Sequence, residues 1–216
     1  MSKLFDDASL AMIPSAYKDG KLYSIRPTDG SGDFTFSRGS NLAATRVDVN
    51  GLIEKGRENL LLQSNQFDTT WALGGASVTS GQAGYDGSND AWQLTSINSV
   101  AGQRVQQTFT AVSGVYNFSC YAKAGNYNQD LYFRIVGSTS YRAYFDLSDG
   151  SIQGGSNLID YKSTDVGNGW YRFEASFNVS NANTFEIRFR DNNDAGSYFY
   201  IQDAMLNQGM VSYPYV

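Results

Sequence analysis

The chain has 216 residues, and its 41% hydrophobic content is enough to pack one large β-sandwich, with or without an extension. Only 17% of the residues are charged, whereas 22 glycines, 15 tyrosines and 13 phenylalanines favour pleated strands joined by turns. The formal net charge of -5 argues against a dedicated nucleic-acid binder, because such proteins need clustered lysine and arginine.

Several chemistries are excluded by missing residue types. Histidine is absent, which removes Ser-His-Asp and Cys-His catalysis and histidine-ligated zinc. Cys120 is the single cysteine, so neither an intrachain disulfide nor a cysteine zinc site can form. Asp6 and Asp7 stand where a signal peptide would be apolar, and no run of about 18 apolar residues occurs. We therefore expect a protein that is made in the cytoplasm, has no membrane partner and is not an enzyme.

Residues 1–58 are predicted to form an extended N-terminal arm with short hairpins. Turn signals such as Asp29-Gly30 and Asn50-Gly51 separate β-prone segments at 21–26, 33–37 and 45–49, none of which can bury a core alone. We expect the arm to dock on a neighbouring chain through five apolar residues: Leu10, Met12, Ile13, Tyr17 and Tyr23. The alternative is that the arm covers an edge of the sandwich in the same chain.

From residue 59 to residue 216 the pattern predicts an all-β domain. Polar and apolar residues alternate through 115–121 and 185–190, as in strands with one solvated face. Glycine-containing turns separate nine such segments, which is typical of a sandwich or barrel. The predicted strands are 59–63, 90–95, 104–109, 114–122, 131–136, 141–147, 170–179, 184–190 and 197–206.

Three aspartate pairs are the candidates for carboxylate catalysis: Asp86 with Asp90, Asp146 with Asp149, and Asp191 with Asp194. Each pair lies in or beside a turn rich in glycine and asparagine, where aspartate normally binds nearby backbone. We therefore expect these residues to form turns and not to catalyse. Asp86 and Asp90 also offer oxygen ligands for calcium, with a simple turn as the alternative.

Aromatic side chains are the other candidates, because sugar rings stack on exposed aromatic groups. Trp92 and Trp170 lie within alternating strands and are expected in the core. The candidate carbohydrate-binding residues are Trp71, which follows the polar segment 68–70 and is expected at the surface, Tyr127, which lies in the loop 125–128, and Tyr132.

Several motifs carry a resemblance to known proteins. Residues 34–40 (FTFSRGS), 45–54 (TRVDVNGLIE) and 57–67 (RENLLLQSNQF) resemble a segment of virion proteins of tailed bacteriophages, notably marine ones. The resemblance continues through 84–92 (GYDGSNDAW), 119–124 (SCYAKA), 167–172 (GNGWYR) and 200–209 (YIQDAMLNQG). The second part also resembles the jelly rolls of carbohydrate-binding modules, which implies an all-β jelly-roll β-sandwich with an N-terminal extended arm. Such modules often hold a structural calcium, which would map here onto Asp68 and Asp203.

Three functions remain open. The first is a structural protein of a phage virion, assembled with other virion proteins and with copies of itself, which docks by its arm and displays the sandwich. The second is an adhesin module that binds a cell-surface glycan for host attachment. The third is a polysaccharide-degrading enzyme, which requires two carboxylates facing each other across a groove about 5 to 10 Å apart.

Overall fold

The computed structural model describes residues 8–18, 21–35, 45–47, 53–55, 58–190, 194–210, 212 and 215, with the backbone alone at 13–18, 45–47 and 53–55. The chain divides into two compact units, Met1–Glu58 and Asn59–Val216. Among the described residues there is no helix that is long and apolar enough to cross a membrane.

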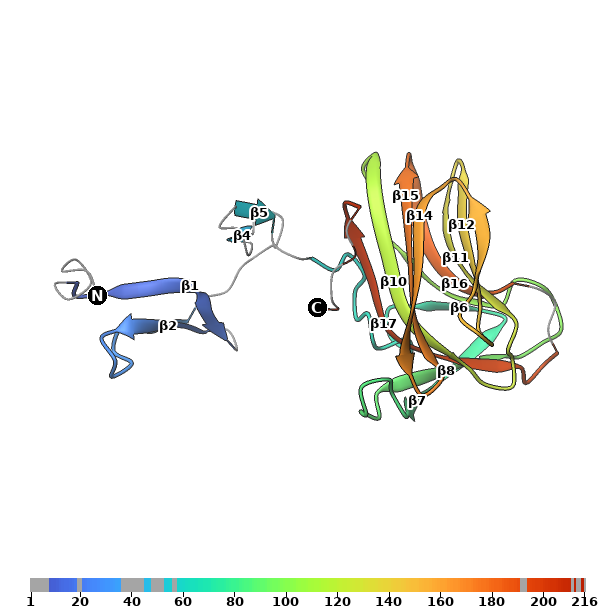
Figure 1. The fold of residues 1–216 in the computed structure, drawn as a ribbon, viewed down its shortest axis with the longest axis horizontal. Helices are drawn as coiled ribbons and strands as arrows, with labels where there is room; N and C mark the ends of the chain where they lie inside the picture. Colours follow the sequence, from blue (N-terminus) through green and yellow to red (C-terminus); the bar gives the residue numbers. More distant parts are fainter. Residues whose placement is uncertain are drawn as a thin grey trace. The chain divides into compact units, whose positions relative to one another are not determined.

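Two six-stranded antiparallel sheets pack face to face in the second unit (Figure 1). The first sheet contains β7 (Ala76–Gln82), β8 (Ala91–Ser96), β10 (Gly114–Ala124), β14 (Leu158–Gly167), β15 (Trp170–Val179) and β17 (Tyr198–Gln208). The second contains β6 (Ala72–Gly74), β9 (Arg104–Thr108), β11 (Asp130–Gly137), β12 (Ser140–Asp146), β13 (Ile152–Ser156) and β16 (Ala182–Phe189). The strand orders are β14-β15-β10-β17-β8-β7 and β13-β12-β11-β16-β9-β6. The predicted all-β jelly-roll sandwich is thereby confirmed.

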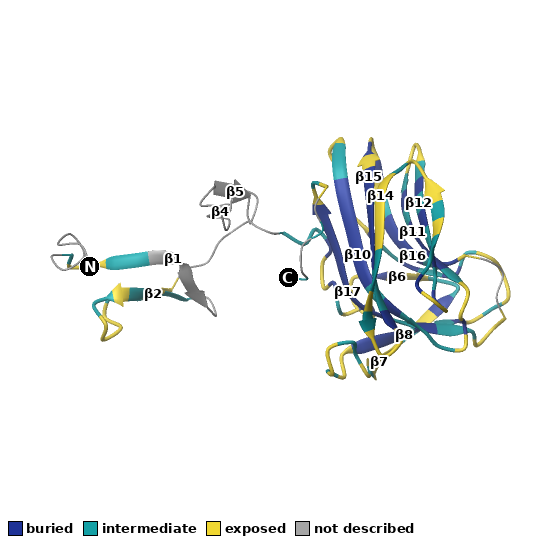
Figure 2. Ribbon diagram, viewed as in Figure 1, coloured by how far each residue is buried: buried dark blue, intermediate teal, exposed yellow. Residues whose placement is uncertain are grey.

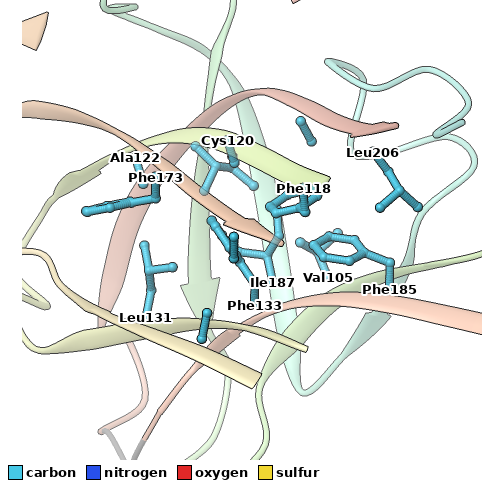
Figure 3. Packing of buried hydrophobic residues seen from close by; sticks show 14 of the residues in the cluster. Val105, Phe118, Cys120, Ala122, Leu131, Phe133, Phe173, Phe185, Ile187 and Leu206 are labelled. Atoms are coloured by element: carbon cyan, nitrogen blue, oxygen red, sulfur yellow. The ribbon is translucent and has the colours of Figure 1, made fainter. Parts of the chain in front are cut away.

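Aromatic side chains from the inner faces of both sheets fill the core (Figure 3). The ring of Phe118 on β10 stacks on that of Phe185 on β16, with centroids 3.8 Å apart, and meets the ring of Phe133 on β11 at 4.3 Å. The buried residues lie along the inner strands of both sheets (Figure 2). Cys120 on β10 is completely buried, and its thiol donates a hydrogen bond of 3.4 Å to the carbonyl oxygen of Gln202.

Eight of the nine predicted strands of this unit are present, with shifted ends. The exception is the segment 59–63, which is irregular at 59–60 and forms a bend and turn at 61–63. The Asn59 side chain accepts hydrogen bonds from the backbone of Leu61 and Leu206, each of 3.1 Å, and thereby fixes the segment beside β17 without a strand ladder. The prediction of a strand at 59–63 is wrong because these side-chain bonds replace regular pairing.

The first unit contains two small sheets. β1 (Ala11–Lys18), β2 (Lys21–Arg26) and β3 (Phe34–Thr35) form one, and β4 (Thr45–Val47) pairs with β5 (Ile53–Lys55) in the other. Leu10 keeps 46% of its surface exposed and Tyr23 keeps 41%, while Met12 is half-buried. The side chains of Ile13 and Tyr17 lie outside the described residues. The docking role of all five residues stays a prediction.

Candidate functional site

The outer face of the second sheet carries two rows of aromatic and charged side chains. Pairing between strands sets these rows, because residues directly opposite one another share a face. Across β12, β11, β16 and β9 the first row is Tyr144, Tyr132, Arg188 and Arg104, and the second is Arg142, Arg134, Glu186 and Gln106. We call these eight residues and the adjacent Arg190 the Tyr–Arg face.

The rings and guanidinium groups of this face stack on one another. The centroids of Tyr132 and Tyr144 lie 5.2 Å apart. The guanidinium carbon of Arg188 lies 5.2 Å from the ring centroid of Tyr132, and that of Arg190 lies 4.5 Å from the ring of Tyr144. Tyr132 is only 8% exposed, whereas Tyr144 is half-buried. Tyr132 therefore forms the base of the face, and Tyr144 and the arginines form its accessible surface.

One buried carboxylate holds three of the arginines. Glu186 contacts Arg188 at 2.8 Å, Arg104 at 3.2 Å and Arg134 at 3.4 Å, measured between nitrogen and carboxylate oxygen. Burial also raises the pKa of the Tyr132 phenol, although the nearby arginine charges oppose this. The phenol is therefore a neutral hydrogen-bonding group at neutral pH.

A polar groove lies on the outer face of the first sheet, with a cavity volume of about 190 Å³. Its floor includes Glu174, which is ion-paired with Arg172 at 3.4 Å and with Lys162 at 3.9 Å. Asn117 is 4% exposed, and its side-chain oxygen has no hydrogen-bond partner among the described residues. Tyr161 borders the groove but pairs with a core-facing residue of β15, so its ring belongs to the opposite side of β14. The groove therefore offers polar groups without an aromatic platform.

Asp86, Asp90 and Asp203 meet in a hydrogen-bonded network beside β17. The Gln202 amide donates to Asp90 at 2.7 Å and to Asp86 at 3.3 Å, and the Tyr85 hydroxyl donates to Asp203 at 3.0 Å. Burial raises the pKa of Asp203 to about 6, and the charges of Asp90 and Asp86 add to this effect. Burial also raises the pKa of Tyr85.

This network contains three of the four aspartates expected to hold calcium, Asp86, Asp90 and Asp203. The described residues contain no group of three or more acidic, histidine or cysteine side chains that could hold a metal ion. Protein donors, including the Gln202 amide and the Ser88 hydroxyl, satisfy Asp86 and Asp90. Asp68 is exposed, and none of these bonds reaches it. As arranged, these residues do not form a cation-binding cluster, and structural calcium stays a prediction.

No family model matches this chain, and no curated protein matches it. The solved structures similar to it include the enzymatically active domain of tailspike protein 4 of bacteriophage CBA120, at 17% identity and a TM-score of 0.43. That likeness covers 69% of this chain and 21% of the tailspike chain.

Carbohydrate-binding modules are also among the similar structures. The xylan-binding domain CBM22-1 of Paenibacillus barcinonensis Xyn10C is 14% identical, with a TM-score of 0.47 over 72% of this chain and 97% of that one. TmCBM61, solved with β-1,4-galactotriose, is 12% identical, with a TM-score of 0.39 over 71% of this chain and 100% of that one.

Two of the predicted sugar-binding residues are not at the surface. Trp71 is 5% exposed, and its indole packs on Phe67 at 5.0 Å and donates a hydrogen bond to the carbonyl of Gln63. Tyr127 is 4% exposed and packs on Phe189 at 4.9 Å. The expected surface position of Trp71 is therefore wrong, and both residues belong to the core. Of the three candidates, only Tyr132 lies on an outer face.

The aspartate pairs form turns where they are described. Asp86 accepts a hydrogen bond from the backbone of Ser88, Asp146 from that of Ser148, and Asp149 from that of Ser151. Asp191 lies outside the described residues. The expectation that these aspartates stabilise turns is confirmed for Asp86, Asp146 and Asp149.

The sequence reasoning missed the arginines of the Tyr–Arg face. Arg134 and Arg188 occupy the polar positions of strands that were correctly predicted from their alternation. Only strand register places Arg134 opposite Glu186 and Arg188 opposite Tyr132 on one face, and a single sequence does not give that register. A signal was present, because five of the ten arginines fall within the three predicted strands 104–109, 131–136 and 184–190 and at position 142 of a fourth.

Proposed function

We propose that the sandwich binds carbohydrate through the Tyr–Arg face and that the chain is displayed on a phage particle. The observation that supports glycan binding is the Tyr132–Tyr144 ring pair on an outer sheet face, 5.2 Å apart and surrounded by guanidinium donors. Aromatic rings pack against the apolar faces of sugar rings, and the arginines donate to their oxygen atoms.

In this proposal the sandwich binds the glycan but does not hydrolyse it. The buried carboxylate of the face, Glu186, is ion-paired with three arginines and so serves to hold them in place. Asp86, Asp146 and Asp149 accept hydrogen bonds from the backbone of their own turns, and the chain has no histidine. These features support a binding module over a hydrolase.

The virion setting is supported by the resemblance of residues 34–216 to phage virion proteins and by the surface of the arm. Besides Leu10 and Tyr23, the first unit exposes 39% of Ile25 and 51% of Phe34. Apolar groups at this density suit an interface with a neighbouring chain. The partners in this proposal are other virion proteins and further copies of the chain.

The test of glycan binding is a screen of the purified protein on immobilised polysaccharides, followed by titration of the best ligand. Tyr144→Ala should weaken binding by about threefold to tenfold, because a ring contact is lost. Tyr161→Ala is the matched control, since Tyr161 is 46% exposed on another surface. Loss of binding in Tyr161→Ala with none in Tyr144→Ala would contradict the proposal, as would the absence of any glycan ligand.

A further inference from the structure

We infer that the Tyr–Arg face selects an acidic polysaccharide, whose sugar units carry carboxylate or sulfate groups. This inference rests on the proposed glycan binding and names the class of glycan. Four observations on the face carry it: opposed arginines, an excess of positive charge, preorganisation by one carboxylate, and rings placed beside the cations.

Arginines lie directly opposite one another at two places on the face. Arg104 on β9 is paired in register with Arg188 on β16, and Arg134 on β11 with Arg142 on β12. Like charges directly opposite one another destabilise a sheet. Between Arg134 and Arg142 the shared acceptor is the Ser140 hydroxyl, which receives hydrogen bonds of 2.9 Å and 3.3 Å and carries no charge. An anionic ligand would remove this repulsion.

The Tyr–Arg face carries a net positive charge, although the whole chain is negatively charged. Its five arginines meet three carboxylates on the same side of the sheet, Glu186, Asp130 and Asp146, which leaves a formal charge of +2. The whole chain carries -5. Arg142 forms no ion pair among the described residues, and Arg104 keeps 33% of its side chain exposed despite its contact with Glu186. Arg142 and Arg104 are therefore the cations available to an incoming acid group.

Glu186 fixes the direction of the guanidinium groups before a ligand arrives. Its side chain is 6% exposed and contacts three arginines, which it can orient but cannot neutralise. Guanidinium groups bind carboxylates and sulfates through two parallel hydrogen bonds, and fixing them in advance reduces the entropy lost on binding. Adjacent strands lie about 4.8 Å apart, so acid groups that recur along a polymer can meet successive arginines.

The same face favours a polysaccharide over a nucleic acid. A duplex presents one charge per about 1.7 Å, and its binders carry large basic surfaces. A charge of +2 on a chain of -5 is too small for that. The half-buried Tyr144 ring instead offers a stacking surface on the same face of β12 as Arg142, which fits a sugar ring that bears an acid group. Arg190 lies over the same ring but is ion-paired with Asp130.

The experiment measures binding of the full chain to four probes at low ionic strength: dextran sulfate, alginate, uncharged dextran, and a DNA duplex of mixed sequence. The inference expects binding to dextran sulfate or alginate and weak binding to dextran and DNA. Raising the salt concentration should weaken the binding, because exposed charges are screened. A preference for one of the two acidic polymers distinguishes sulfate from carboxylate recognition.

Variants then locate the site. Arg142→Gln and Arg104→Gln should each weaken binding to the acidic polymer by about twofold to fivefold. Lys123→Gln, which removes one cation from the outer face of the first sheet, should leave it unchanged. Arg142→Gln disturbs no ion pair among the described residues, so its melting temperature should match that of the unmodified protein.

The following results would overturn the inference that the face selects an acidic polysaccharide. Binding to dextran or another neutral glycan alone, lost in Tyr144→Ala, would overturn the acidic class and leave the proposed glycan binding intact. Binding to none of the three polysaccharides would overturn the inference, and the wider polysaccharide screen would then decide the proposed glycan binding separately. DNA binding as tight as that of dextran sulfate, or full binding by Arg142→Gln and Arg104→Gln, would overturn the inference.

Discussion

Asp203 occupies a bulge in β17, where its φ is 54° and the pairing with β10 shifts by one residue between Ser119–Met205 and Tyr121–Gln202. A bulge of this kind leaves an extra residue unpaired and changes the direction of its side chain. Here it places the Asp203 carboxylate under the Tyr85 hydroxyl, with 7% exposure. A single backbone irregularity thus buries a charge.

This burial predicts a pH dependence of stability. The pKa of Asp203 is raised from an ordinary 3.8 to about 6, so the folded protein retains a proton that the unfolded chain has lost between these values. The unfolding free energy should therefore fall as pH rises from about 4 to about 6. The full shift corresponds to about 3 kcal/mol, which solvent screening of this partly buried group reduces to about 2 kcal/mol. Urea unfolding at several pH values from 4 to 8 measures the effect.

Asp203→Asn is the control for that prediction. The substitution keeps a hydrogen-bond acceptor for Tyr85 but removes the titrating group. The difference between the unfolding free energies of the two proteins should then change with pH across this window. Parallel curves would show that Asp203 does not titrate there. Asp149, whose pKa is lowered by hydrogen bonds from Ser151, acts below this window and cancels in the difference.

At the scale of strands, alternation predicted the interior of each sheet and missed its edges. The eight strands found from the sequence are β8, β9, β10, β11, β12, β15, β16 and β17, and each has a neighbour on both sides. The missed strands are β6, β7, β13 and β14, which lie at the four sheet edges. Edge strands are mostly exposed here, so they lack the buried face that produces a period of two.

The site was less predictable than the fold. Tyr132 could be named as one of the aromatic residues able to stack on a sugar, but the residues around it come from four strands that only register brings together. For Trp71 the local sequence suggested the wrong position. The polar residues 68–70 before it indicate a surface, yet the turns at 61–70 fold the indole inward, where its centroid lies 6.5 Å from that of Phe185.

The inner strands also predict where substitutions are most costly. Phe133→Ala removes a completely buried ring that lies 4.3 Å from Phe118 and 5.2 Å from Phe145, and should destabilise the sandwich by about 3 to 5 kcal/mol. Ile97→Ala, at a residue that is 59% exposed, should cost less than about 0.5 kcal/mol. Chemical denaturation compares the two, and equal effects would contradict the assignment of the core.

At the scale of the whole chain, the two units differ in how they bury apolar surface. Both six-stranded sheets and the core between them come from residues 59–216. The first unit has a three-stranded and a two-stranded sheet, and its described part leaves Leu10, Tyr23, Ile25 and Phe34 exposed. Small sheets of this size are marginal on their own, which favours stabilisation by a partner.

Deletion of residues 1–33 should therefore leave the sandwich folded and abolish assembly. The expected melting temperature of the second unit is unchanged within a few degrees, because its strands all lie later in the chain. Light scattering after size exclusion, and incorporation into particles, measure assembly. Deletion of residues 1–7 alone is the control, since it keeps Leu10 and the strands that follow.

The two interpretations of the arm predict different results for the longer deletion. A truncated protein that still assembles would contradict docking through the arm. One that aggregates or loses thermal stability would instead favour an arm that covers an edge of its own sandwich.

The buried thiol of Cys120 can report on the opening of the sandwich. Burial raises the pKa of this thiol and removes it from solvent, so a thiol reagent can reach it only when β10 separates from its neighbours. Because the chain has no second cysteine, the labelling rate of the unmodified protein reports how often the centre of the sandwich opens. If a polymer bound to the Tyr–Arg face stabilises the folded sandwich, it should slow the labelling of Cys120, so the labelling rate measured with and without polymer reports binding.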